Sequence, residues 1–153
     1  MRLRALEADP LAFSSTWSEE RSRAEGHWQE RAATGAGSTD SSTWVAVDPD
    51  GRLVGLTVIA RVEGVQHVFS MWVAPEFRGQ GLGGRLLDAV LAWARRTLPA
   101  GEVHLEVNPR QAAAVALYRS RGFRYTGSPS PLGHSGAEVV QEMVLPEPSP
   151  ELR

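Results

Sequence analysis

The 153-residue sequence contains neither cysteine nor lysine. The lack of cysteine excludes disulfides, a thiol nucleophile and cysteine-ligated metal sites. All sixteen basic residues are arginines, and isoleucine and asparagine occur once each, at Ile59 and Asn108. Because Lys, Ile and Asn have codons rich in A and T, we attribute this bias to a GC-rich genome rather than to function.

Long apolar stretches are also missing. No run of about 18 apolar residues is present, so no membrane-spanning helix is predicted. The N-terminal MRLRALEADP lacks the apolar core of a secretory signal, and the net charge of -2 offers no general basic surface for nucleic acid. His27, His67, His104 and His134 show no ligand spacing such as HxxxH. We therefore expect a metal-free cytoplasmic protein that binds neither nucleic acid nor membrane.

The hydrophobic pattern predicts a mixed α+β fold. A helix ends near residue 8, before ADPLAF, and a second helix covers residues 16–33, where Thr16 and Glu19 have capping-box spacing. The rest of the pattern predicts strands at 43–47, 52–62, 65–73, 102–107, 123–127 and 137–145, with helices from Leu82 onward and over 110–122. We expect one domain over residues 1–145 and a Pro-rich tail at 146–153.

The first three strands are joined by the short turns DPDG and EG. Such tight connections are typical of antiparallel neighbours. The three strands are therefore predicted to form an antiparallel meander.

The stretch VAPEFRGQGLGGRLLDAV joins the third strand to a helix through four glycines in six residues. Glycine lets another molecule approach the backbone closely. The first N–H groups of a helix have no partner within it, and the helix dipole is positive there. With Arg78 in front, this turn predicts a phosphate site. The simpler interpretation is a tight connection beside a surface arginine, but one glycine would suffice for that.

Two phosphate ligands fit such a turn. GQGLGG matches the dinucleotide motif GxGxxG, and Glu106 follows Gly84 by 22 residues. That motif normally begins directly after the first strand of a parallel sheet. Here APEFR intervenes and three meander strands come first, so a nicotinamide-dependent oxidoreductase is the lesser alternative.

The other interpretation includes the arginine, because RGQGLG is Arg-x-x-Gly-x-Gly. With ALYRSRGF further along, and with DPLAFSSTWSEE and EVVQEMVL, the sequence resembles the GCN5-related N-acetyltransferase (GNAT) superfamily over roughly residues 10–145. The resemblance implies the acyl-CoA N-acyltransferase fold, a central, mostly antiparallel sheet flanked by helices. It also implies acetyl transfer from acetyl-CoA to a primary amine in a ternary complex.

The resemblance further implies a set of site residues. The pantetheine arm would lie between two splayed strands and pair with the backbone of Met71, Trp72 and Val73. The pyrophosphate would be held by the loop and the helix start, at Arg78, Gly79, Gln80, Gly81, Leu82, Gly83, Gly84 and Arg85. Relatives carry asparagine seven residues before the tyrosine of ALYRSRGF, where this chain has Gln111; Asn108 is out of register.

Two residues are candidates for proton transfer. Tyr118 corresponds to the tyrosine that protonates the departing CoA thiolate, and a phenol can do so at neutral pH; the alternative is a buried structural tyrosine. Strand alternation places Glu106 with His104 on one face, and Leu105 with Val107 on the other. Glu106 is thus either the general base or a solvent-facing glutamate. His67, Ser70 and Glu63 are weaker alternatives for the base.

The acceptor is expected to be a small-molecule or peptide amine. It would enter between the helix at 16–33 and the loop at 127–137, where Trp17, Trp28 and His134 either line the site or belong to the core. A non-catalytic acyl-CoA-binding or sensor module is the main alternative function. Dimers are common among relatives, so a homodimer is one expectation.

The family normally begins with a strand that this sequence lacks, which would leave residues 43–47 as an apolar edge. Either the start codon is assigned too far downstream or another chain covers that edge.

Overall fold

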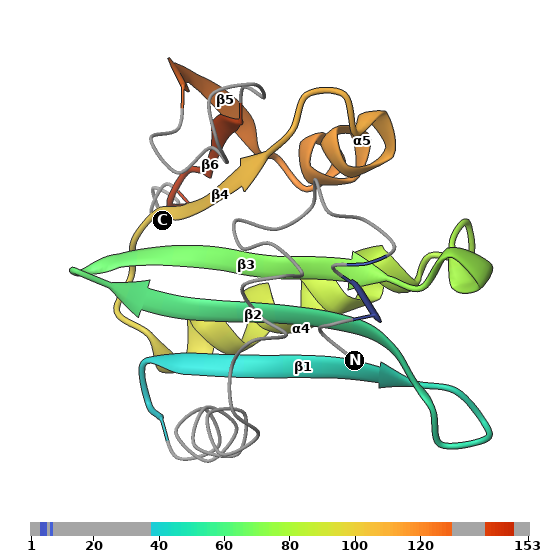
Figure 1. Ribbon diagram of the computed structural model, residues 1–153. Coiled ribbons are helices and arrows are strands. Elements are labelled where there is room, and N and C mark those ends of the chain that lie inside the picture. The colour runs from blue at the N-terminus through green and yellow to red at the C-terminus, as the bar shows by residue number, and fades with distance from the viewer. Residues whose placement is uncertain (1–3, 6, 8–37, 130–139, 149–153) are drawn as a thin grey trace.

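The computed structural model describes residues 4, 5, 7, 38–129 and 140–148. Arg4, Ala5 and Glu7 are helical. The remaining elements follow the predicted order β-β-β-α-β-α-β-β, with a short 3-10 helix before the first long helix (Figure 1). They are β1 (Ser41–Val47), β2 (Leu53–Val62), β3 (Val65–Val73), η2 (Pro75–Phe77), α4 (Leu82–Thr97), β4 (Val103–Val107), α5 (Ala112–Ser120), β5 (Arg124–Pro129) and β6 (Gln141–Leu145).

The described strands form one sheet in the order β1-β2-β3-β4-β6-β5. Every neighbouring pair is antiparallel except β3 and β4, which are parallel and connected through α4. The predicted meander is confirmed, because β1 pairs antiparallel with β2 and β2 with β3. The mixed, mostly antiparallel sheet with helices against it is the fold that the resemblance implied.

The helix α4 lies against the sheet because its apolar side chains form one stripe. Leu86, Leu87, Val90, Leu91 and Ala94 are all buried, and Leu82 is half-buried. Leu87, Val90, Leu91 and Ala94 join a core cluster with Ile59 of β2, Val68 of β3 and the buried side chains of β4. Since β4 alternates buried and half-buried residues, one of its faces belongs to this core and the other does not.

A second, smaller core lies near the N-terminal helical residues. Ala5 is fully buried and packs with Val54, Trp72 and Ala74. The Arg4 guanidinium carbon lies 6.0 Å from the centre of the Trp72 ring. The Trp72 side chain therefore belongs to this second core.

The observed boundaries differ from the predicted ones by a few residues. β1 begins at Ser41, two residues early, and α5 covers Ala112–Ser120 instead of residues 110–122. The helix expected at 16–33 lies outside the described residues, as do Trp17, Trp28 and His134. In the described sheet β1 is an edge strand, and Val45 and Val47 are exposed.

Candidate active site

The two parallel strands at the centre of the sheet separate along their length. β3 and β4 pair only at Gln66–Val103, His67–His104 and Val68–Leu105. Beyond Val68, β3 continues to Val73 along β2, while β4 turns away (Figure 1). The two strands thus form a V that opens toward their carboxyl ends. From Phe69 to Val73, β3 still pairs with β2, but its other edge has no ladder with any strand among the described residues.

β3 carries a β-bulge close to the point where β3 and β4 separate. Val58 pairs with Phe69 and Leu56 with Trp72, so one residue of β2 lies opposite two residues of β3, Ser70 and Met71. Ser70 has a φ of 56°, a left-handed conformation that is uncommon outside glycine. A bulge bends the strand that carries it, and this one lies where β3 leaves β4.

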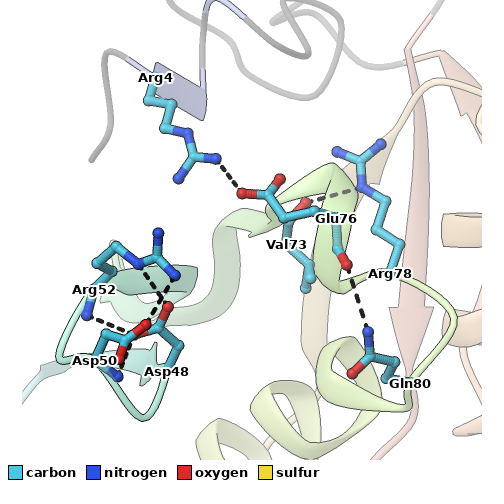
Figure 2. Close-up of polar contacts among 8 residues, drawn as sticks. All are labelled: Arg4, Asp48, Asp50, Arg52, Val73, Glu76, Arg78 and Gln80. Carbon is cyan, nitrogen blue, oxygen red and sulfur yellow. Dashed lines mark hydrogen bonds and ion pairs between the residues drawn. The ribbon is translucent and has the colours of Figure 1, made fainter.

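The loop after β3 folds back on the end of its own strand. Ala74 and Pro75 lead into η2, and the Arg78 side chain returns to donate from Nε to the Val73 carbonyl oxygen at 2.9 Å (Figure 2). Glu76 is tied to Arg4 by an ion pair, and Gln80 Nε2 donates to the Glu76 carbonyl at 3.5 Å. These contacts give the loop a defined shape, with Arg78 next to the last residue of β3.

Two of the four glycines supply backbone geometry. Gly79 and Gly81 have φ of 72° and 77°, and no atom of the described residues lies within 4 Å of the position that a Cβ would take at either. Gly81 is the N-cap of α4, which has no side-chain cap and no acidic residue in its first turn, although that turn is fully described. The first N–H groups of this 16-residue helix thus have no side-chain cap and lie at the positive end of its dipole, an arrangement suited to a phosphate.

The other two glycines lie where helices and strand pack together. A Cβ at Gly83 would lie 3.4 Å from Leu117 Cδ2 and 3.8 Å from atoms of Met71 and Val73, which are ordinary contact distances. A Cβ at Gly84 would lie 2.5 Å from Nη2 of Arg121. The structure thus brings the end of β3, the start of α4 and the last turn of α5 to one place.

Tyr118 is buried in the last turn of α5. That helix ends in a Schellman motif: the Phe123 N–H donates to the Tyr118 carbonyl at 3.1 Å, and the Gly122 N–H donates to the Arg119 carbonyl at 3.0 Å. Gly122 has a φ of 93°, and the Phe123 and Tyr118 rings lie 6.0 Å apart. LYRSRGF is therefore partly a helix-termination signal. Burial raises the pKa of Tyr118 well above its usual value, so the phenol keeps its proton.

Glu106 lies at the point where the strands separate. It directly follows Leu105, the last β4 residue paired with β3, and it shares the half-buried face of β4 with His104, as strand alternation predicted. Glu106 interacts electrostatically with His67. His104 Nδ1 lies 2.9 Å from Glu142 Oε1, and its ring centre is 5.5 Å from that of His67.

The remaining predicted residues take different places. Gln111 is the N-cap of α5, and Asn108 is buried in the turn before it, where its Oδ1 accepts the Arg110 N–H at 2.9 Å. Arg85 is exposed in the first turn of α4. Glu63 lies in the β2–β3 hairpin, at the opposite end of β3 from the opening.

Residues 3–123 match the sequence profile described as "Acetyltransferase (GNAT) family". This covers well over half of the chain, so the protein belongs to that family, as the Arg-x-x-Gly-x-Gly loop and ALYRSRGF had indicated.

Two curated relatives have sequences similar to this chain. The "N-alpha-acetyltransferase RimI" of Mycobacterium tuberculosis is 39% identical over 88 residues, which are 55% of this chain and 53% of that protein. The "Streptothricin acetyltransferase" of Streptomyces lavendulae is 37% identical over 95 residues, 61% of this chain and 50% of that protein. The chain thus spans about half the length of these relatives.

Solved structures agree on the fold. A crystal structure of nourseothricin acetyltransferase has a TM-score of 0.63 at 35% identity, over 71% of this chain and 66% of that one. A phosphinothricin acetyltransferase from Sinorhizobium meliloti, in complex with acetyl-CoA, has a TM-score of 0.69 at 20% identity, over 95% and 83% of the two chains. The second likeness concerns the fold alone.

Membrane spans and metal clusters are both missing from the described residues. None of the helices there is long and apolar enough to cross a membrane. No group of three or more His, Asp or Glu side chains within the same residues could hold a metal ion.

Proposed function

We propose that this protein is an N-acetyltransferase that moves the acetyl group of acetyl-CoA to a primary amine. The observation that carries the proposal is the uncapped N-terminus of α4 beside the open end of the β3–β4 pair. A phosphate group needs such donors, and an extended acyl-pantetheine arm needs a strand edge to pair with. The family to which the chain belongs supports the same donor.

The proposed donor site has three parts. Backbone N–H groups from Gly79 to Gly84 receive the pyrophosphate, and Arg78 and Arg85 add positive charge. The β3 backbone from Met71 to Val73 pairs with the pantetheine amides, because this edge diverges from β4. Gln111, at the start of α5, contributes its amide.

In the proposed reaction the amine nitrogen attacks the thioester carbonyl carbon. A C–N bond forms, the tetrahedral intermediate collapses, and the C–S bond breaks. The leaving thiolate takes a proton from the Tyr118 hydroxyl, which is protonated at neutral pH with or without the increase in pKa that burial causes. Direct transfer is favoured because the chain has no cysteine to hold an acyl group.

The attacking amine must also lose a proton. We assign this role to the Glu106 carboxylate, which lies beside the point where β3 and β4 separate. His67 is the alternative base: burial and the neighbouring His104 lower the pKa of His67, so its imidazole is neutral at pH 7 and able to accept a proton.

The acceptor is proposed as a primary amine on a small molecule or a peptide. The similar proteins include an N-alpha-acetyltransferase and acetyltransferases of streptothricin and nourseothricin. Both peptide and antibiotic amines therefore belong in the first acceptor panel.

The test has two stages. Titration calorimetry and thermal unfolding with acetyl-CoA, CoA and NADH come first; a ligand at a hundredfold its Kd adds about 2.7 kcal/mol to the free energy of unfolding. Stabilisation by acetyl-CoA and CoA but not by NADH is expected. A thiol-release assay over the amine panel follows. No response to either CoA form would refute the donor site, whereas binding without turnover of any amine would favour a non-catalytic acyl-CoA-binding module.

A further inference from the structure

An ion pair joins the two helices of the proposed site. Arg121, at the C-cap of α5, donates from Nε to Asp88 Oδ1 and from Nη2 to Asp88 Oδ2, both at 3.0 Å. Asp88 lies one helical turn after Gly84 in α4. Two parallel bonds from one guanidinium to one carboxylate fix direction as well as distance.

The guanidinium is seated against the first turn of α4. The ideal Cβ position at Gly84 is 2.5 Å from Arg121 Nη2 and 3.3 Å from its Cζ, so any side chain at residue 84 would displace the guanidinium. Gly84 is itself buried. The fourth glycine of the loop is thus needed for Arg121, whereas Gly79 and Gly81 shape the backbone in front of the helix.

At its other end Arg121 is part of the turn that holds Tyr118. The Arg121 N–H donates to the Tyr118 carbonyl at 3.0 Å, and Nη1 donates to Ser120 Oγ at 2.9 Å. Ser120 Oγ donates in turn to the Leu117 carbonyl at 2.6 Å. The side chain therefore connects the start of α4 with the last turn of α5.

We propose that Arg121 is a positioning residue, which couples the phosphate-binding end of α4 to the turn of α5 that carries Tyr118. This inference rests on the proposed function. An anion that reduces the motion of the first turn of α4 also fixes the surface of Gly84 against which the guanidinium packs. The hydrogen bonds of Arg121 then reduce the motion of the last turn of α5.

The experiment is hydrogen exchange measured by mass spectrometry, with CoA as the probe, so that no acceptor is required. In the unmodified protein CoA should slow exchange both in residues 79–85 and in residues 117–122. In Arg121→Gln, CoA should still slow exchange in residues 79–85. The slowing in residues 117–122 should become about fivefold smaller, which corresponds to a modest coupling free energy between the two sites. Arg121→Lys, which keeps the charge but not the paired bonds, should restore part of it.

Gly84→Ala tests the same contact from the other side. It displaces only the end of a flexible side chain, so the fold should persist. It should reproduce Arg121→Gln, and the double variant should be no worse than either single one. Arg52→Gln is the matched control: it breaks another arginine–aspartate pair, in the β1–β2 turn (Figure 2), and should leave the exchange pattern of the unmodified protein.

The outcomes separate the two proposals. Full CoA-dependent slowing of α5 in Arg121→Gln, or additive effects of Gly84→Ala and Arg121→Gln, would overturn the role of Arg121 alone. No slowing of residues 79–85 in the unmodified protein would overturn the proposed donor site, and the inference with it.

Discussion

Replacing Gly81 by alanine tests the loop most directly. Gly81 has a φ of 77°, and no described atom lies within 4 Å of the position that a Cβ would take there, so the cost of alanine is conformational rather than steric. A left-handed conformation costs an L-residue about 1–2 kcal/mol. The folded protein with alanine at this position has two ways to respond.

In the first, the loop keeps its shape and the strain lowers the free energy of unfolding by about 1–2 kcal/mol, which lowers Tm by roughly 2–8 °C. In the second, the loop relaxes and its N–H groups turn away. Stability is then kept, but CoA must restore the loop when it binds, and its affinity falls by about 5- to 30-fold. The stability loss and the binding loss should therefore sum to about 1–2 kcal/mol.

Thermal unfolding and calorimetry with CoA measure both quantities. Gly51→Ala is a matched control, since Gly51 has a φ of 80°, equally open surroundings and a place in the β1–β2 turn. It should lose similar stability with no change in CoA affinity. Gly81→Asn should lose less than Gly81→Ala, because asparagine tolerates the left-handed region. If Gly81→Ala changed neither quantity, the argument from the loop backbone would be refuted.

Three further predictions concern the proton-transfer residues. Tyr118→Phe should lower kcat by about 10²- to 10⁴-fold with little change in CoA affinity, as judged by thiol release and calorimetry; a loss below about threefold would speak against the acid role. Glu106→Gln should lower kcat/KM at neutral pH by a factor in the same range, and a larger loss in His67→Gln would move the base to His67. The pKa of His67 is lowered in the folded protein, whereas in the unfolded chain it lies near the ordinary histidine value of 6.5. Between these two pKa values the unfolded chain binds more protons than the folded protein. Stability should therefore fall as pH drops below about 6.5, and urea unfolding from pH 8 to 5 should show a weaker fall in His67→Gln. The carboxylates of Asp88 and Glu142, whose pKa values are also lowered, titrate in a separate window below about pH 4.5.

Much of the fold could be predicted because its signals are local. The alternation in β4, the tight turns between the first strands and the apolar stripe of α4 each depend on neighbouring residues. The phosphate-type loop could be recognised for the same reason. The Gly122 cap also follows from a local rule, because glycine is the usual residue just beyond the end of a helix.

The bulge could not be predicted from the strand itself. VQHVFSMWV has the pattern of a continuous strand, and the extra residue becomes apparent only when β3 is aligned with β2. Its position depends on pairing between two strands, so no local pattern marks Ser70. The place where β3 leaves β4, and hence the neighbourhood of Glu106, was anticipated only through resemblance to a family.

The roles of the four glycines show the same division. In sequence the four glycines form one motif, which predicts a single role for all of them at a phosphate. In the structure Gly79 and Gly81 turn the backbone in open space, whereas Gly84 makes room for a side chain 37 residues further along. The need for glycine at residue 84 comes from Arg121 at the end of α5, so the motif GQGLGG alone could not reveal it. A glycine-rich motif should thus be divided by the sign of φ and by what a Cβ would meet before each glycine is assigned to a ligand.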